Sequence, residues 1–275
     1  MSTATLSCVL YICNLKSLPT GPDLCQTFKE HLSPDAATNR TRAWWEWACM
    51  IERELDKGEE YKCKDLRIMG DRPVCYDLPF RPRKPCLVYS FGIDFNYVFD
   101  DAMASQQDCD VFSFDPSMGE MDHQHAPKVS FKAIGLAARD SNSYQPNLDH
   151  YVKDIVTWKV RTLASIRRML GHENRTLDIL KMDIETYEWE VIRDLLASRQ
   201  LSSVRQLIIE WHIFPDEPYR HRFTDMYRSL LALKRIGFRQ VYVNSFDRYH
   251  HREYFNSQAD VSMVNTQFLK LSTRD

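Results

Sequence analysis

The sequence predicts an α/β fold in which a mostly parallel sheet is covered by helices on both faces. Three observations predict it. Short apolar runs alternate with amphipathic, helix-length segments from residue 86 onward, and strands separated by helices imply right-handed crossovers and a parallel sheet. One of these runs, Leu177–Met182, passes directly into acidic residues and a helix start. The last two runs have no helix-length segment between them, so we expect that pair to be antiparallel.

The chain is expected to divide into three stretches. Residues 1–40 show no periodicity and are expected to be a tail or a leader. Residues 41–84 hold an N-terminal helix, Thr41–Glu60, followed by a linker rich in cysteine and proline, and residues 85–275 form the main domain. Apolar residues recur on one face of the N-terminal helix, so it should pack on the main domain.

The main domain is expected to contain seven strands, because short apolar runs in it are bounded by turn residues. These strands are Cys86–Ser90, Asp110–Phe114, Val129–Ile134, Leu177–Met182, Gln206–Trp211, Phe238–Asn244 and Val261–Leu271. Segments with helical periodicity between them are Tyr97–Gln106, Thr157–Gly171, Tyr187–Ser198 and Phe223–Gly237. Two polar segments, Met118–Lys128 and Arg139–His150, are expected to be loops that shape the substrate pocket.

Composition excludes two classes of protein. The net charge of the 275-residue chain is -2 and its isoelectric point is about 6.5. Nucleic-acid-binding domains usually have a basic face and a high isoelectric point, so we expect no nucleic-acid partner. No apolar run approaches the roughly 18 residues that a bilayer-spanning helix requires. Nothing in the sequence indicates an oligomeric state.

All eight cysteines lie in the first 109 residues, and the chain carries two Asn-x-Thr glycosylation sequons. An even number of cysteines together with sequons is typical of an oxidising compartment, so we expect the secretory pathway or the Golgi lumen, with the cytoplasm as the alternative. Cys63 and Cys75 can form a bridge, although sequence alone does not set connectivity. Cys86 and Cys109 begin neighbouring predicted strands, where they either pair or only pack.

The first motif with chemical content joins the turn Ser90–Gly92 to an acid, Asp115, at the end of the next strand. A nucleotide-like ligand needs a glycine turn for close backbone approach and a carboxylate that accepts from two ribose hydroxyls. Asp94 and Asn96 stand where further glycines would be expected, which disfavours the pyrophosphate of a dinucleotide. S-adenosylmethionine has a ribose and a cationic sulfonium but no phosphate, so it suits this motif better.

Acidic residues and a histidine follow two later strands of the predicted sheet. Asp183 and Glu185 end the fourth strand, and His212 closes the fifth. In open α/β sheets ligands bind outside the carboxyl ends of the strands, so these residues should meet at the ligand. The pKa of a histidine lies near neutrality, and His212 is therefore either a general base or a cleft residue that transfers no proton. The loop Asp122–His125 lacks a third ligand cluster, and we expect no metal site.

These motifs together resemble the FkbM-type methyltransferases and an animal branch of that family. The resemblance is carried by Val88–Ile93, Val111–Pro116, Leu177–Ile192 and Leu207–His212, and it covers roughly residues 84–271. It implies a Rossmann-like class I methyltransferase fold with a seven-stranded, mostly parallel sheet and one antiparallel strand. It also implies S-adenosylmethionine as methyl donor and transfer to a hydroxyl oxygen.

The resemblance also implies roles for individual residues. The glycine turn would contact the methionine part of the cofactor, Asp115 would accept from the ribose hydroxyls, and Gly135 would lie beside the adenine. The full set of expected cofactor-binding residues is Ser90, Phe91, Gly92, Ile93, Asp115, Pro116, Ile134, Gly135 and Asp183. The expected catalytic residues, one of which would accept the proton, are His212, Asp183 and Glu185.

The sequence therefore predicts an S-adenosylmethionine-dependent O-methyltransferase acting on a small-molecule or glycan hydroxyl. Two alternatives remain open. A non-catalytic protein on the same fold, which has lost the cofactor, is favoured by the degenerate turn around Asp94 and Asn96. Ser90 and Thr186 also depart from the family, which has an acid and a glycine at these positions. A nicotinamide-dependent oxidoreductase would use a similar sheet, but the single glycine of the turn argues against it.

Overall fold

The computed structural model describes residue 25 and residues 42–148, 152–213, 220–245 and 258–272. The expected leader over residues 1–40 lies outside the described residues, apart from Cys25. In the described part of the chain, no helix is long and apolar enough to cross a membrane.

The centre of the described fold is an eight-stranded sheet with the strand order β12-β13-β11-β10-β3-β4-β6-β5. Five strands, β3, β4, β6, β10 and β11, are parallel neighbours, whereas β13 runs antiparallel to both β11 and β12. The bounds are β3 Leu87–Phe91, β4 Asp110–Phe114, β5 His123–Ala126, β6 Val129–Lys132, β10 Leu177–Met182, β11 Val204–His212, β12 Phe238–Ser245 and β13 Gln258–Asn265. The seven expected strands are all present, and the expected antiparallel pair β12–β13 is confirmed.

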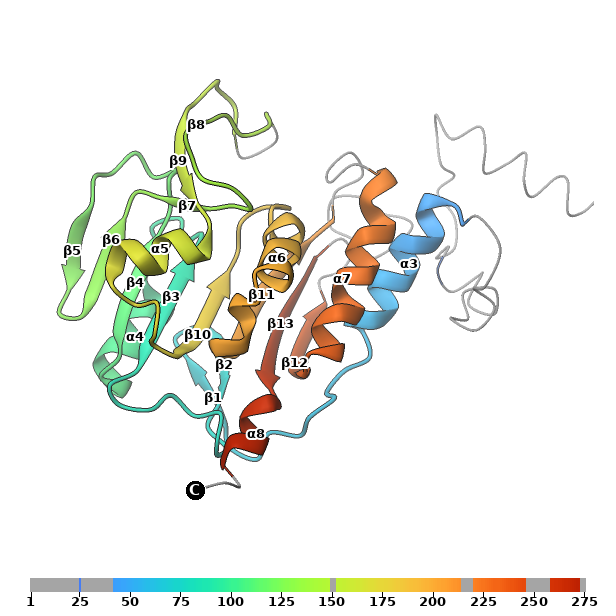
Figure 1. Cartoon of the computed structure of the whole chain (residues 1–275), viewed down its shortest axis with the longest axis horizontal. Helices are drawn as coiled ribbons and strands as arrows, with labels where there is room; N and C mark the ends of the chain where they lie inside the picture. The colour runs from blue at the N-terminus through green and yellow to red at the C-terminus, as the bar shows by residue number, and fades with distance from the viewer. Residues whose placement is uncertain (1–24, 26–41, 149–151, 214–219, 246–257, 273–275) are drawn as a thin grey trace, which may run out of the picture.

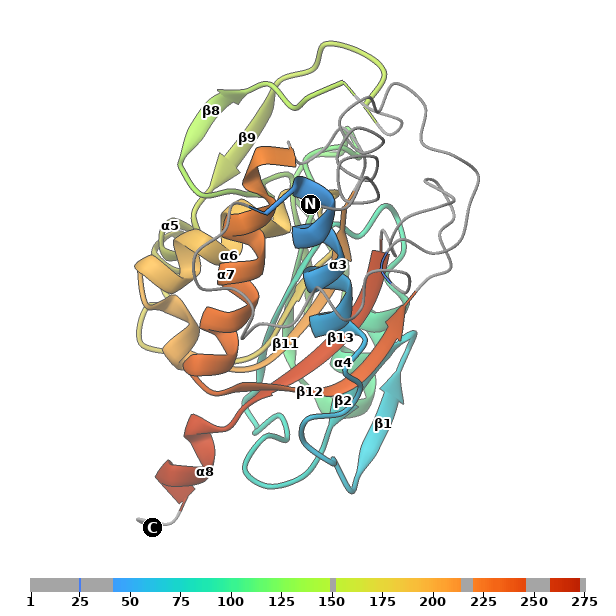
Figure 2. The same cartoon turned by 90° about the vertical axis from the view of Figure 1, so that its right-hand side faces the viewer.

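Helices cover both faces of this sheet (Figures 1 and 2). The first face carries α3 (Trp44–Leu55), α5 (Leu163–Leu170), α6 (Glu188–Ala197) and α7 (Phe223–Arg235), and the second carries α4 (Val98–Gln107) with the hairpin β1–β2 (Leu66–Met69 and Arg72–Cys75). Side chains alternate along a strand, so Tyr89 and Phe91 of β3 pack on the first face and Val88 packs on the second. Both faces are therefore buried, as parallel sheets require.

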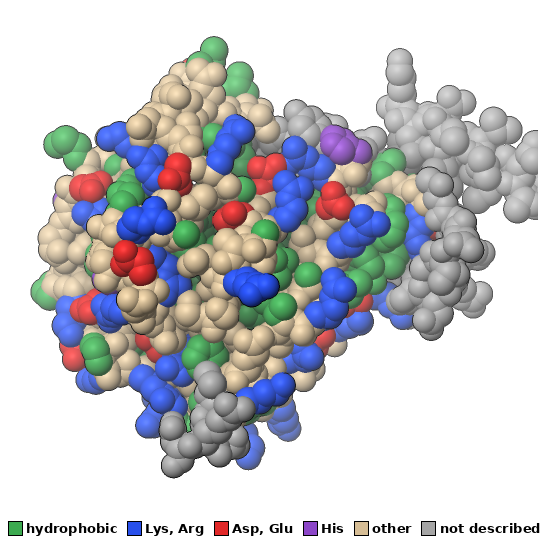
Figure 3. Space-filling view, in the orientation of Figure 1, with side chains coloured by type: hydrophobic (Ala, Val, Ile, Leu, Met, Phe, Trp, Pro, Cys, Tyr) green, Lys and Arg blue, Asp and Glu red, His purple; other side chains and the backbone are tan. Residues whose placement is uncertain are grey.

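A small three-stranded sheet rises above the carboxyl ends of the central strands (Figure 1). It consists of β7 (Gly135–Leu136), β8 (Ser141–Tyr144) and β9 (Trp158–Arg161). The remaining elements are the 3-10 turns η3 (Gln200–Ser203) and η4 (Arg220–Arg222) and the last helix α8 (Gln267–Ser272). On the face shown in Figure 3, basic and acidic side chains are interspersed rather than separated by sign.

Several expected boundaries are wrong. The helix expected over Thr157–Gly171 begins only at Leu163, because Trp158–Arg161 pairs with β7 and β8 and the Thr162 hydroxyl accepts from the Ser165 backbone N–H to cap the helix. Aromatic and branched residues at alternate positions of that segment favour a strand. The last strand ends at Asn265, and α8 follows it.

Strands also occur where the sequence gave no periodic signal. The linker contains the hairpin β1–β2, and the two expected polar loops contain β5 and β8. These strands are only four residues long. Elements so short are defined by pairing with a neighbour rather than by local periodicity.

Three disulfides connect the described cysteines: Cys25–Cys49, Cys63–Cys75 and Cys86–Cys109. The two pairs that the sequence left open are therefore both bridged. The remaining cysteines, Cys8 and Cys13, lie outside the described residues.

The Cys86–Cys109 bridge joins the starts of β3 and β4, the two strands that lead to the glycine turn and to Asp115. We expect the double change Cys86→Ala/Cys109→Ala to lower the free energy of unfolding by roughly 2–4 kcal/mol, because a bridge mainly restricts the unfolded chain. Urea unfolding under non-reducing conditions measures this loss. Adding a thiol reductant should destabilise the wild-type protein at least as much, and equal stability of wild type and variant would contradict the prediction.

Helix α3 is joined to the main domain by aromatic and ionic contacts with α7. Trp44 packs edge-on against Phe223, and Lys234 Nζ donates to Glu54 Oε2 over 2.8 Å. Burial on its own raises the pKa of Glu54, but the ammonium groups of Lys234 and Lys57 outweigh burial and lower it. The docking of α3 thus depends on an ionised Glu54.

Because the pKa of Glu54 is lower in the folded protein, its contribution to stability is present above the unfolded pKa and is lost as pH falls through the folded value. We expect Glu54→Gln to reduce the free energy of unfolding by about 1 kcal/mol at pH 7 and by much less at pH 3. Urea unfolding at both pH values tests this. The exposed Glu59 provides the control, because Glu59→Gln should change stability little at either pH.

Candidate functional site

A cavity of about 480 Å³ lies at the carboxyl ends of β3, β4, β10 and β11, under the small sheet. Its lining residues come from the ends of those strands, from the turns that follow them and from the small sheet. They are Phe91, Gly92, Asp94, Phe114, Asp115, Pro116, Ser117, Gly135, Leu136, Ala137, Tyr144, Val152, Trp158, Val160, Asp183, Ile184, Glu185, Tyr187 and Glu210. This is the edge of the sheet where the sequence predicts ligand binding.

The charged side chains that line the cavity are all acidic. Among the described residues that line the cavity, five are carboxylates (Asp94, Asp115, Asp183, Glu185 and Glu210) and none is lysine or arginine. A cationic ligand is therefore favoured here over a phosphate.

The turn after β3 brings three strand ends together at Gly92. The backbone N–H of Gly92 donates to Phe114 O over 2.9 Å, and Lys181 Nζ donates to Gly92 O over 3.3 Å. Gly92 has φ +70°, and a Cβ atom there would lie 1.5 Å from the carbonyl oxygen of Asp183. Only glycine fits this position, because no side chain can share that space.

Asp115 follows β4 and is 5% exposed. One carboxylate oxygen, Oδ2, accepts from the backbone N–H of Asp94 over 3.0 Å. The other, Oδ1, accepts from the backbone N–H and the hydroxyl of Ser117 over 2.8 and 2.6 Å. An ionised carboxylate offers about four lone-pair positions, so capacity remains for a hydroxyl of a ligand. Asp115 thus organises the glycine turn and also faces the cavity.

At the other end of the cavity, three carboxylates surround the ring of His212, which is 0% exposed. His212 Nε2 lies 3.9 Å from Asp183 Oδ1, 3.7 Å from Glu185 Oε2 and 3.5 Å from Glu210 Oε1. The opposite ring nitrogen, Nδ1, lies 3.0 Å from Glu188 Oε1. The ring is thus fixed between α6 and the ends of β10 and β11.

Burial and neighbouring charges compete in setting the pKa values of this cluster. Burial raises the pKa of Glu185 to about 8 and raises that of Asp183 as well, although His212 opposes both shifts. Burial alone would lower the pKa of His212, but Glu188, Glu210 and Glu185 outweigh it and raise that pKa well above its usual value. For Glu210, His212 and Arg72 outweigh burial and lower the pKa.

Arg72 reaches this cluster from the hairpin β1–β2. Its Nη2 lies 3.4 Å from Asp183 Oδ2 and 3.3 Å from Glu210 Oε2, and its Nη1 donates to Asp260 Oδ1 on β13. The guanidinium therefore contacts one oxygen of Asp183 and one of Glu210, in each case the oxygen on the side away from His212. Arg72 thus joins the hairpin to three strands of the sheet.

Most of the residues that the sequence predicts for the site line this one cavity. They are Phe91, Gly92, Asp115, Pro116, Gly135, Asp183 and Glu185. Ser90, Ile93, Ile134 and His212 do not line it and are buried. Ser90 is in register with Lys181 of β10 and Ser113 of β4, on the face of the sheet that α4 covers.

Sequence reasoning missed four residues of the site. Trp158 lies in a segment that the sequence predicts to be helical, and Tyr144 lies in an expected loop. Both line the cavity from the small sheet. Glu210 could have been found, because it is an acid near the carboxyl end of a predicted strand. No sequence pattern indicated that Arg72 belongs to the site, because it lies in a linker with no clear periodicity.

Known proteins are similar to this chain in sequence. A family model described as "Methyltransferase domain" matches residues 25–266. The chain is 26% identical over 149 residues to the "Probable methyltransferase-like protein 24" of Homo sapiens and 27% identical over 130 residues to that of Rattus norvegicus. These alignments cover 51% and 47% of this chain but only 37% and 34% of the relatives.

Among solved structures, the chain is similar to the methyltransferase FkbM from Methylobacillus flagellatus. The TM-score is 0.38 and the sequence identity is 13%, and the match covers 86% of this chain and 58% of that chain.

Proposed function

Because the chain belongs to a family of methyltransferase domains, we propose that it transfers the methyl group of S-adenosylmethionine to a hydroxyl oxygen of a small molecule or glycan. The observation that carries this proposal is the cavity at the carboxyl ends of β3 and β4. It combines the Gly92 turn with the Asp115 carboxylate on the adjacent strand, and its lining is acidic without a basic side chain in the described residues.

The residues of the cavity fit the chemistry of this cofactor. Its volume of about 480 Å³ lies within the range of roughly 300–1,000 Å³ that is usual for small-molecule sites. Asp115 can accept from a ribose hydroxyl, and Pro116 and Leu136 offer apolar surface to an adenine. The carboxylates of Asp183 and Glu185 suit the ammonium and sulfonium charges. A dinucleotide would instead bring its pyrophosphate among five carboxylates.

Catalysis in this proposal is mainly positioning. The bound cofactor supplies an electrophilic methyl group. Asp183 and Glu185 line the cavity and are the groups that can accept the proton of the acceptor hydroxyl. His212 lies behind them and does not line the cavity. Its Nδ1 is hydrogen-bonded to Glu188, and in this proposal its ring supports the end of the cavity where the two carboxylates lie. The proposal thus keeps the absence of proton transfer from the second expected role of His212, but it places the ring behind the cavity and not on its surface.

The compartment of this activity is part of the proposal. Three disulfides among the described cysteines support an oxidising environment, where structural disulfides form and persist. Glycans are abundant acceptors in the secretory pathway, which agrees with a glycan hydroxyl as substrate.

Calorimetric titration of the purified protein tests the proposed cofactor. We expect saturable, micromolar-range binding of S-adenosylmethionine and of S-adenosylhomocysteine, and no binding of nicotinamide dinucleotides. Binding of a dinucleotide instead would support an oxidoreductase. Absence of any binding by a protein with native circular dichroism would support a non-catalytic member of the family. Release of S-adenosylhomocysteine in the presence of hydroxyl-bearing acceptors then identifies the substrate class.

A further inference from the structure

We propose that Asp183, Glu185 and His212 form a binding site for a divalent transition-metal ion at one end of the cavity. The proposal goes beyond methyl transfer, because such a site would bind its ion whether or not the cofactor binds. It also differs from the expectation from sequence, which was that the chain holds no metal.

The distances between the potential ligand atoms carry the proposal. One ligand atom from each of Asp183, Glu185 and His212 lies within 4.8 Å of the other two. His212 Nε2 lies 3.7 Å from Glu185 Oε2 and 3.9 Å from Asp183 Oδ1, too far for hydrogen bonds. Two ligand atoms that are each about 2.1 Å from a four-coordinate ion lie about 3.4 Å apart. The two distances from His212 Nε2 thus exceed this separation by only a few tenths of an ångström.

The orientation of His212 matches that of a metal ligand. Glu188 Oε1 accepts from the backbone N–H of Ile184 over 2.8 Å and from His212 Nδ1 over 3.0 Å. A histidine that binds a metal through one ring nitrogen almost always donates from the other to a carboxylate or a carbonyl. Glu188 therefore fixes the ring so that Nε2 is the atom directed at the carboxylates.

The charges around the site also favour a cation. Arg72 takes Asp183 Oδ2 and Glu210 Oε2, which leaves Asp183 Oδ1 and Glu210 Oε1 on the side of His212. Five carboxylates belong to the cluster: Asp183, Glu185, Glu188, Glu210 and Asp260. Arg72 and Lys181 supply two positive charges. Carboxylates therefore outnumber the cationic side chains around the His212 ring, and a divalent ion would bring its positive charge to the side where the acids are concentrated.

The ligand types indicate the class of ion. One imidazole nitrogen with two or three carboxylate oxygens suits Mn²⁺, Fe²⁺ or Zn²⁺ better than an all-oxygen ion such as Ca²⁺. An ion could enter from the cavity, because Asp183, Glu185 and Glu210 line it. If the proposed methyl transfer is correct, a bound ion would also be placed to hold the acceptor hydroxyl and lower its pKa.

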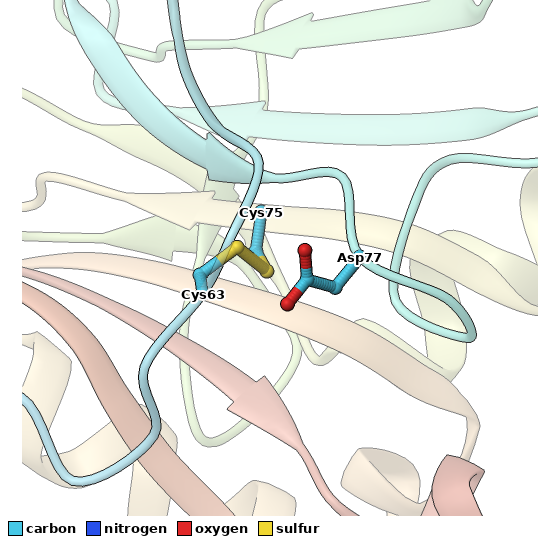
Figure 4. Close-up of side chains that lie close together, drawn as sticks. All are labelled: Cys63, Cys75 and Asp77. Carbon is cyan, nitrogen blue, oxygen red and sulfur yellow. A yellow bond between two sulfur atoms is a disulfide. The ribbon is translucent and has the colours of Figure 1, made fainter.

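A second cluster with metal-ligand residue types does not compete with this site. Cys63, Cys75 and Asp77 also lie close together in the described residues. Figure 4 shows that the two sulfur atoms are joined as a disulfide, so they cannot serve as thiolate ligands. Asp77 accepts from the backbone N–H groups of Lys64 and Asp65 instead.

Titration with Mn²⁺ tests the site, because free and bound Mn²⁺ are distinguished by electron paramagnetic resonance. The full chain is stripped with a chelator, dialysed and titrated without cofactor. We expect one Mn²⁺ per chain, displaced by Zn²⁺. The change Glu185→Gln, on the cavity surface, should weaken Mn²⁺ binding at least tenfold, and Glu188→Gln should weaken it roughly 10–100-fold by releasing the histidine.

The exposed loop acid Glu120 and histidine His123 provide matched controls outside the cluster. Glu120→Gln and His123→Gln should leave Mn²⁺ binding unchanged. Failure of the folded wild-type protein to bind Mn²⁺ or Zn²⁺ would overturn the metal site, as would equal binding by Glu185→Gln. Because S-adenosylhomocysteine binding is measured separately, its loss would count against the proposed function and not against the metal site.

Discussion

Replacing Gly92 with alanine is expected to abolish cofactor binding and to lower the free energy of unfolding by more than about 3 kcal/mol. The added Cβ would lie 1.5 Å from Asp183 O and 2.7 Å from Asp183 C. Both are backbone atoms at the end of β10, so no side-chain rotation can relieve the overlap. The end of β10 would have to move, and with it the Asp183 side chain that lines the cavity.

Gly119 separates this steric effect from the cost of the backbone conformation alone. Gly119 has the same φ of +70° as Gly92, but a Cβ there would meet nothing within 4 Å. We expect Gly119→Ala to cost about 1 kcal/mol and to leave binding of S-adenosylhomocysteine intact. Urea unfolding and calorimetric titration of both variants measure the difference. Equal losses of stability and of binding would show that the contact with β10 has no special role.

Part of the site could be predicted from sequence, because it lies at the ends of strands that are recognisable from their own residues. The runs Asp110–Phe114 and Leu177–Met182 are observed with the predicted bounds. A strand that is buried on both faces is mostly apolar and ends where polar residues become frequent. Asp115 and Asp183 are therefore placed at the sheet edge by the strand that precedes each of them, and parallel neighbours bring the two edges together.

The rest of the site depends on contacts between segments that are far apart in the chain. Arg72 contacts Asp183 and Asp260 across 111 and 188 residues, and no local pattern encodes such contacts. The segment that contains Trp158 has residues that favour a strand. That strand forms only because β7 and β8 pair with the segment. The grouping of His212 with Asp183 and Glu185 was predicted from topology, whereas the burial of the His212 ring behind the cavity was not.

Replacing Asp115 with alanine is expected to weaken binding of S-adenosylhomocysteine by roughly 10- to 150-fold or more. Three hydrogen bonds already use three of the about four lone-pair positions of Asp115, so one ribose hydroxyl can donate to it. A hydrogen bond to a charged group contributes about 1.5–3 kcal/mol, which is roughly 10- to 150-fold in Kd at about 1.4 kcal/mol per tenfold. The alanine also removes the acceptor for Asp94 N and for the N–H and hydroxyl of Ser117. Part of the loss would therefore come from a loosened glycine turn.

Asp115→Asn separates the two contributions to this loss. Asparagine keeps one carbonyl oxygen, which can still accept from the N–H and hydroxyl of Ser117. Its amide nitrogen cannot accept from the Asp94 N–H, so the turn keeps two of its three hydrogen bonds to residue 115 while the charge is lost. We expect this variant to bind S-adenosylhomocysteine more tightly than Asp115→Ala but at least tenfold more weakly than the wild type. Asp94→Asn removes a different carboxylate from the same lining and controls for general charge. Wild-type affinity in Asp115→Asn and Asp115→Ala would mean that no ribose lies at the end of β4, and the cofactor would have to be sought elsewhere in the cavity.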